Sequence, residues 1–160
     1  MILGEIEKLD SSQHYSTDIF YWKGWTAIFE DDWIKAKDFF NKTGKNSDLI
    51  ELCTRVEDEK YSVTFAKVIS YILPGSGQFY TGHWLSGIMS LGWNALFGYL
   101  SLNAFLEDRA FDGIMLTGLL WMRFYRGNIQ NAEEFAVEEN LKISNKALSF
   151  LQKQYQGIKP

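Results

Sequence analysis

The sequence predicts an all-α fold that consists of a helical N-terminal region, a membrane-embedded hairpin of two helices and an amphipathic C-terminal helix. Three observations lead to this prediction. The 39 residues from Val68 to Leu106 contain no Asp, Glu, Lys or Arg, although these residues make up 22% of the chain. Inside that apolar region, the run Pro74-Gly75-Ser76-Gly77 interrupts any continuous helix. Beyond it, pairs such as Glu138 and Lys142 are spaced as on the solvated face of a helix.

The N-terminal region, residues 1–60, carries thirteen acidic and eight basic residues. We expect three helices there, at residues 16–29, 31–42 and 47–60. A linker from Asn41 to Ser47 separates the last two helices, and Ser47 or Asp48 is the expected N-cap of the third.

The segment 62–84 begins as an apolar helix that the proline and the glycines must break. Broken backbone at membrane depth persists only where protein or water surrounds it. We therefore expect a re-entrant or interfacial helix followed by a tight turn, with a complete third membrane span as the alternative. Gln78 can both donate and accept, so we expect it to pair with backbone groups that the break releases.

The hairpin is predicted from two apolar segments on either side of the polar turn Glu107-Asp108-Arg109. Residues 85–106 would form a helix of about 33 Å, and residues 110–125 one of about 24 Å. Small and polar residues at helical spacing mark the seam between the two helices, because lipid provides no hydrophobic force between them and small residues permit close approach. These residues are Ser90, Asn94, Gly98 and Ser101 on the first helix and Gly113 and Thr117 on the second. Asn94 either hydrogen-bonds between the helices or binds a solute or ion.

Aromatic and basic residues predict the orientation of the hairpin. Tyr80 and Trp84 precede its first helix, while Trp121 and Tyr125 close the second, so all four fit one interfacial belt. Basic residues flank the open end of the hairpin, whereas its turn region has one arginine and three acids. By the positive-inside rule, both tails are expected in the cytoplasm. The predicted domains are therefore residues 1–60, 61–126 and 127–160.

Two motifs resemble a known family. The run from Pro74 to Gly82, followed by Gly87, resembles the P-G-x-G-Q-x-Y-x-G…G signature of small bacterial membrane domains, similar to the two-transmembrane-segment domain family. The run from Phe124 to Ala132 is similar to the phrase F-Y-x-G-N-x-x-x-A that ends the second helix in that family. The matching residues are Pro74, Gly75, Gly77, Gln78, Tyr80, Gly82, Gly87, Phe124, Tyr125, Gly127 and Asn128. The resemblance covers roughly residues 62–140 and implies a bacterial inner-membrane location, but it implies no established chemistry.

The N-terminal region resembles a single tetratricopeptide repeat. The positions that carry this resemblance are Phe20, Gly24, Trp33, Ala36 and Phe40, whereas Lys23 and Ala27 depart from the pattern. About three repeats are normally needed for a stable solenoid, and only one is visible. The region is therefore either a docking platform or an ordinary helical pair that packs on its capping helix. The candidate partner-binding residues are Phe20, Trp22, Trp25 and Trp33.

The composition and the motifs argue against several classes of protein function. A net charge of −4 argues against general attraction to nucleic acid. One cysteine and two histidines leave little for a disulfide framework or a metal centre, and no catalytic motif is present, so we expect no enzyme, metal or cofactor.

The predicted function is that of a non-enzymatic integral membrane protein, a scaffold or accessory factor for membrane-protein or envelope assembly. Its expected partners are the lipid bilayer and other membrane or envelope proteins, and a homo-oligomer is left open. The alternative is a small transport or channel component in which Asn94, Asn103 and Asp112 line a polar path.

Overall fold

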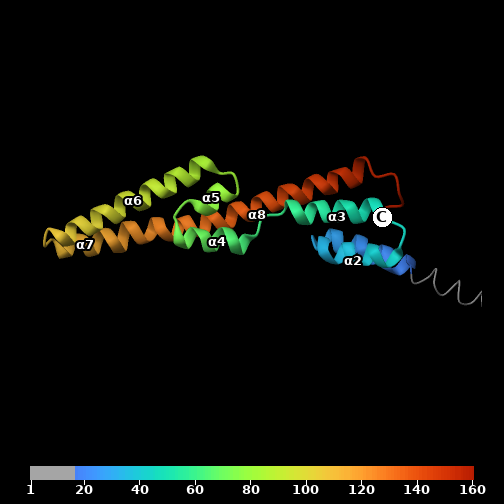
Figure 1. The fold of residues 1–160 in the computed structure, drawn as a ribbon, viewed down its shortest axis with the longest axis horizontal. Coiled ribbons are helices and arrows are strands. Elements are labelled where there is room, and N and C mark those ends of the chain that lie inside the picture. Colours follow the sequence, from blue (N-terminus) through green and yellow to red (C-terminus); the bar gives the residue numbers. More distant parts are fainter. Residues whose placement is uncertain (1–16) are drawn as a thin grey trace, which may run out of the picture. The chain divides into compact units, whose positions relative to one another are not determined.

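A computed structural model describes residues 17–160, and this part of the chain is all-α (Figure 1). Every regular element within it is a helix, which confirms that the fold is all-α. The fold divides into two compact units. The first combines the described part of Met1–Lys60 with Ile143–Pro160, and the second is Tyr61–Lys142. The predicted C-terminal domain, residues 127–160, thus contributes to both units.

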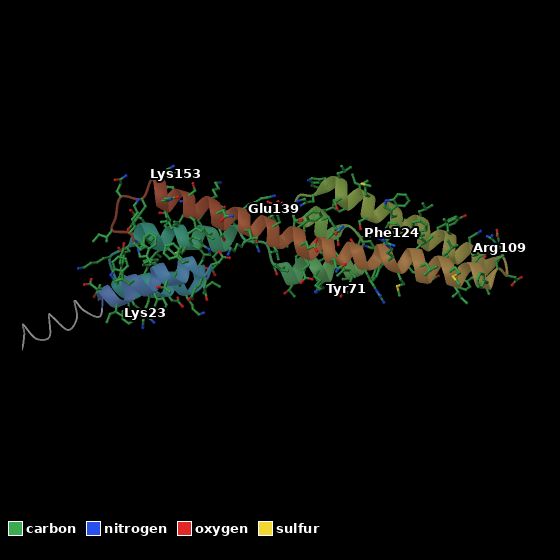
Figure 2. The ribbon with its side chains drawn as sticks, turned by 180° about the vertical axis from the view of Figure 1, so that it is seen from behind. Lys23, Tyr71, Arg109, Phe124, Glu139 and Lys153 are labelled. Carbon is green, nitrogen blue, oxygen red and sulfur yellow. The ribbon has the colours of Figure 1, made fainter. Side chains whose placement is uncertain are left out.

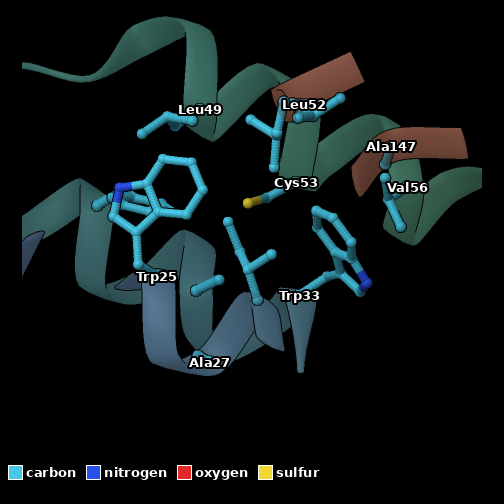
Figure 3. Packing of buried hydrophobic residues seen from close by; sticks show 12 residues of the cluster. Trp25, Ala27, Trp33, Leu49, Leu52, Cys53, Val56 and Ala147 are labelled. Carbon is cyan, nitrogen blue, oxygen red and sulfur yellow. The ribbon is translucent and has the colours of Figure 1, made fainter. Parts of the chain in front are cut away.

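The first unit contains a helix over residues 17–29, α2 (Trp33–Thr43), α3 (Ser47–Glu59) and the end of α8 (Met122–Lys153). Its core is apolar and tightly closed, as Figure 3 shows for Trp25, Leu49 and Cys53 among others. Phe40, Ile28 and Leu49 are the largest fully buried apolar side chains of this core. Hydrophobic burial therefore stabilises this unit in the manner of an ordinary globular protein.

The turn between α2 and α3 differs from the predicted linker. Helix α2 continues through Asn41 and ends at Thr43, because Gly44 follows with a φ of 67° and provides the left-handed C-cap. The N-cap of α3 is Asn46, which makes no side-chain capping bond, and Ser47 is already helical. The predicted caps, Ser47 and Asp48, are therefore wrong by one or two positions.

The second unit contains α4 (Val63–Ile72), the short α5 (Ser76–Tyr80), α6 (Trp84–Leu106) and α7 (Ala110–Met115). The chain then passes without a break through a π-helical segment, η1 (Leu116–Trp121), into α8. Helix α6 contacts both α7 and η1, so the two arms form the hairpin visible in Figure 1. The predicted boundary between residues 126 and 127 lies inside α8, so the C-terminal helix does not begin as a separate element there.

Between residues 17 and 160, no helix is at once long enough and apolar enough to span a membrane. The predicted membrane-spanning segments are therefore not confirmed.

Candidate functional site

The break between α4 and α5 releases backbone carbonyl groups, among them those of Ser70 and Tyr71. In a continuous helix, the carbonyl of Ser70 would accept from the backbone N–H of residue 74, but that residue is proline and has none. The carbonyl of Tyr71 would accept from Gly75, whose N–H instead donates to the Oδ1 atom of Asn128 over 2.7 Å. Both carbonyls therefore need other donors.

The second motif supplies those donors from α8. Asn128 donates through Nδ2 to the Ser70 carbonyl over 3.0 Å, and the Tyr125 hydroxyl donates to the Tyr71 carbonyl over 2.8 Å. Tyr125 and Asn128 lie three residues apart and thus share one side of the helix. The two motifs that the sequence analysis singled out meet here, since α8 caps the end of α4.

Asn128 is the centre of a buried polar cluster, which we call the Asn128 hub: Ser70, Gly75, Gln78, Ser90 and Asn128. The Oδ1 atom of Asn128 accepts from the Ser90 hydroxyl over 2.8 Å as well as from Gly75. Its backbone carbonyl accepts from Nε2 of Gln78 over 2.9 Å. Asn128 is only 2% exposed, and Gln78 and Ser70 are fully buried. The hub therefore joins α4, α5, α6 and α8.

Two glycines of the first motif are required by close packing. Gly75 adopts a φ of 95°, and a Cβ atom there would overlap the Gly87 carbonyl oxygen. A Cβ atom at Gly77 would overlap the Ala66 carbonyl, the Ser70 hydroxyl and the Ala132 side chain. Ala132 is the last residue of the second motif, so small residues in both motifs permit this approach.

The remaining motif residues lie around the hub. The Tyr80 hydroxyl accepts from the Ser62 backbone N–H over 3.2 Å, and the Phe124 ring stacks on Trp93 and Phe97. Gly82 follows Thr81, the C-cap of α5, and has a φ of 83°, and Pro74 is partly buried. Gly127 contacts nothing that would exclude a Cβ atom.

Most seam residues face the inside of the hairpin. Asn94 and Ser101 are buried, and a Cβ atom at Gly98 would lie 3.5 Å from the Trp121 ring. On the other arm, a Cβ atom at Gly113 would overlap the Phe105 ring, while Thr117 lies in η1 and is partly buried. Of the two alternatives for Asn94, the interhelical bond is not formed among the described residues. Its Nδ2 atom donates to the Ser90 carbonyl of its own helix over 2.8 Å, and its Oδ1 atom has no partner there.

The candidate partner-binding residues divide into two groups. Trp25 and Trp33 belong to the core of the first unit and are unavailable to a partner. Trp22 is 44% exposed, and the partly exposed Phe20 stacks on Phe39. Only Phe20 and Trp22 remain candidates, because helical periodicity turns the other two aromatic residues inward.

In the first unit, the surroundings of Asp31 and Cys53 shift the pKa values of these two side chains. Burial raises the pKa of the Asp31 carboxyl, but hydrogen bonds from Ser144, Lys60 and Trp33 outweigh burial and leave that pKa below its ordinary value. Burial raises the pKa of the Cys53 thiol to about 12, so little thiolate forms at neutral pH. Residues 17–160 contain no group of three His, Cys, Asp or Glu side chains that could hold a metal ion.

In the second unit, the distribution of side chains is the inverse of that in an ordinary globular protein: small and polar side chains are buried, and large apolar side chains are exposed. Its buried apolar residues are small, with one exception: Ala66, Ala104, Ile129, Ala132 and Ala136. Its buried polar residues are Ser70, Gln78, Thr81, Asn94, Ser101 and Asn128. Its large apolar side chains point outward, as Figure 2 illustrates along the arms between Phe124 and Arg109. We call this exposed face of α4, α6, α7 and η1 the hairpin apolar surface; it includes Ile72, Leu85, Leu102, Phe111, Ile114 and Leu119.

Comparison with known proteins adds no family assignment, since no family model, curated protein or solved structure matches the chain. The resemblance to two-transmembrane-segment domains stays a prediction.

Proposed function

We propose that this chain is a non-enzymatic membrane-embedded protein that acts as a scaffold or accessory factor at a bacterial inner membrane. In this proposal, lipid covers the hairpin apolar surface, and the first unit docks other proteins through the exposed side of its N-terminal helix, with both tails in the cytoplasm. The observation that carries the proposal is the inverted distribution of side chains in the second unit.

Exposure of this much apolar surface to water is unfavourable, at roughly 25 cal/mol for each Å². Monomeric proteins in water rarely expose contiguous apolar patches larger than a few hundred Å². The second unit instead buries amides, hydroxyls and alanines and exposes Leu, Ile, Phe and Trp. Small residues inside and large apolar residues outside are the arrangement that helices adopt when lipid surrounds them.

The charged groups of the hairpin are consistent with this proposal. At the turn, Arg109 pairs with Glu107 at 2.9 Å and with Asp112 at 3.5 Å, and all three are exposed. The next basic residue along the chain is Arg123, about 20 Å further at the rise of a helix. The intervening residues, 113–122, are uncharged.

The alternative of a channel component has less support. Asn94 and Ser101 are buried, and Asn94 borders a surface cavity beside α6 and α8 that is also lined by apolar residues. Asp112 is exposed at the turn and pairs with Arg109. The polar residues that a pore would need are therefore distributed between the interior of the hairpin and its tip.

Flotation with phosphatidylcholine vesicles tests the proposal. The full chain is expected to float with the vesicles and to stay with them after a carbonate wash. Two variants at positions that are each 65% exposed provide the contrast. Leu119→Lys places a charge on the hairpin apolar surface and is expected to reduce flotation, whereas Phe29→Lys alters the first unit and is expected to have no effect.

A different outcome would overturn the proposal. If the full chain stays in the supernatant as a monodisperse species without detergent, lipid does not cover the hairpin apolar surface. Chemical cross-linking of that species would then show whether a second copy covers it.

A further inference from the structure

Two surface cavities of the second unit meet at the start of α8. One has a volume of about 610 Å³ and is lined by Gly118, Met122, Arg123, Arg126, Gly127 and Gln130. The other, of about 490 Å³, also contains Arg123 and Gly127 and extends along α6 past Leu85, Met89 and Trp93. Arg123 and Gly127 border both cavities, the first of which is the basic cavity. Besides its apolar residues, the second cavity is lined by the polar residues Ser86, Ser90, Asn94, Asn128 and Asn131.

The two arginines make no ion pair with any residue that the structure describes. Within residues 17–160, neither Arg123 nor Arg126 has an acidic partner, whereas Arg109 at the hairpin tip has two. Both side chains are exposed beside their cavity. A guanidinium group presents forked donors that match the oxygens of a phosphate. The basic cavity is therefore suited to one phosphate group.

Two glycines line the basic cavity, and the packing of the fold does not require glycine at either position. A Cβ atom added at Gly127 or Gly118 would meet nothing within 4 Å. Both glycines lie inside helical segments, where glycine is a poor helix former. Gly75 and Gly77, by contrast, are required by close packing. The missing side chains at 118 and 127 thus leave space for a ligand.

We propose that the joined cavities hold the headgroup of one anionic glycerophospholipid. Arg123 and Arg126 bind its phosphate, Gln130 offers an amide beside it, and the acyl chains lie against Leu85, Met89 and Trp93. Basic pockets beside membrane helices recognise anionic headgroups in this way. The inference rests on the proposed function, because it requires that the hairpin meets lipid.

Native mass spectrometry of the full chain in dodecyl maltoside tests this site without a membrane. The chain is titrated with dioleoylphosphatidylglycerol, with dioleoylglycerol, which lacks the phosphate, and with inorganic phosphate. One phosphatidylglycerol is expected to bind, and neither of the other two probes. The double substitution Arg123→Gln and Arg126→Gln is expected to weaken binding at least about tenfold, and Arg109→Gln to leave it unchanged.

A second pair of variants tests the cavity itself. Gly127→Leu fills the shared wall and is expected to abolish retention of the lipid. Gly92→Leu is the matched control, since a Cβ atom there also meets nothing within 4 Å and the residue lines neither cavity.

Three outcomes would overturn the site. Equal binding of dioleoylglycerol would show that the phosphate is not recognised, and equal binding of inorganic phosphate would show that no lipid is required. If Arg109→Gln weakens phosphatidylglycerol binding as much as the double variant does, the lipid is attracted only by the positive charge of the chain. The proposed function fails separately, if the chain does not float with neutral vesicles but still retains phosphatidylglycerol in detergent.

Discussion

Asn128 replaces the hydrogen-bond donor that Pro74 removes from α4. Its side chain accepts from Gly75 and Ser90 and donates to Ser70, so three elements depend on one amide. Gln78, which we expected to lock the turn, contributes one hydrogen bond and leaves its Oε1 atom without a partner in the described chain. The locking role therefore belongs mainly to Asn128.

Substitutions at these two positions should differ strongly in effect. Asn128→Leu leaves three buried groups unpaired, at about 1–3 kcal/mol each, and is expected to lower the free energy of unfolding by more than about 3 kcal/mol. Gln78→Leu removes one hydrogen bond and one unpartnered oxygen, so its effect should stay within about 1 kcal/mol. Denaturant unfolding in detergent measures both. Equal effects would show that the hub does not depend on Asn128.

Asp31 should make the stability of the first unit depend on pH. Because its pKa is lowered in the folded chain, its contribution is present above the unfolded pKa of about 3.9 and is lost as the pH falls through the folded value. Asp31→Asn preserves the left-handed backbone at φ 60° and removes the charge that faces Lys60 at 2.9 Å.

We expect Asp31→Asn to destabilise the chain by about 0.5–1 kcal/mol at pH 7, as for an exposed ion pair with hydrogen bonds. The difference from the parent should shrink as the pH falls below the lowered folded pKa of Asp31, where the carboxyl is neutral in the folded and in the unfolded chain. Urea unfolding followed by tryptophan fluorescence measures this difference. A difference that persists at that pH would show that the charge of Asp31 is irrelevant.

At the scale of elements, the seam of the hairpin depends on small side chains where the arms meet. A Cβ atom at Gly98 would already be in van der Waals contact with the Trp121 ring at 3.5 Å, so a longer side chain at this position would have to displace that ring. Gly98→Leu is therefore expected to cost about 1–3 kcal/mol through overpacking. Gly92→Leu, on an open face of α6, is the control. Thermal unfolding in detergent compares the two variants, and equal melting temperatures would place Gly98 outside the seam.

The sequence predicted the order of the elements better than the contacts between them. The hairpin, the broken segment and the three N-terminal helices were predicted from apolar runs, from glycine and proline, and from residues at helical spacing. The capping of α4 by Tyr125 and Asn128 did not, because it joins residues more than fifty positions apart. A signal for the hub was nevertheless present, since Ser70 is a polar residue in an apolar run four positions before Pro74. Trp25 and Trp33 were misjudged because aromatic residues serve cores and interfaces alike.

At the scale of the whole molecule, the two units are stabilised by opposite means. The first buries large apolar side chains around Cys53, and the second buries polar and small ones around Asn128. The first should therefore keep its structure in water, whereas the second should depend on detergent or lipid around its exposed face.

The thiol of Cys53 reports on this difference. It is fully buried and its pKa is raised to about 12, so a thiol reagent at pH 8 should react only after unfolding. We expect the same slow labelling in detergent, in lipid vesicles and after detergent removal, even where the chain associates through the hairpin apolar surface. Fast labelling on detergent removal would show that the first unit depends on the same surroundings. Labelling in denaturant is the positive control.

The π-helical segment Leu116–Trp121 lets this arm of the second unit lose one residue without losing its contacts. Each residue of an α-helix turns the chain by about 100°, and a π-turn accommodates one residue more than an α-turn. Deletion of Gly118 would let this stretch rewind as an ordinary α-helix, and the residues after the deletion would keep their direction relative to Gly113. Tyr125 and Asn128 would then still face the carbonyls of Tyr71 and Ser70. Deletion of Gly127, inside the α-helical part, would instead rotate Asn128 by about 100° and break its contact with Ser70.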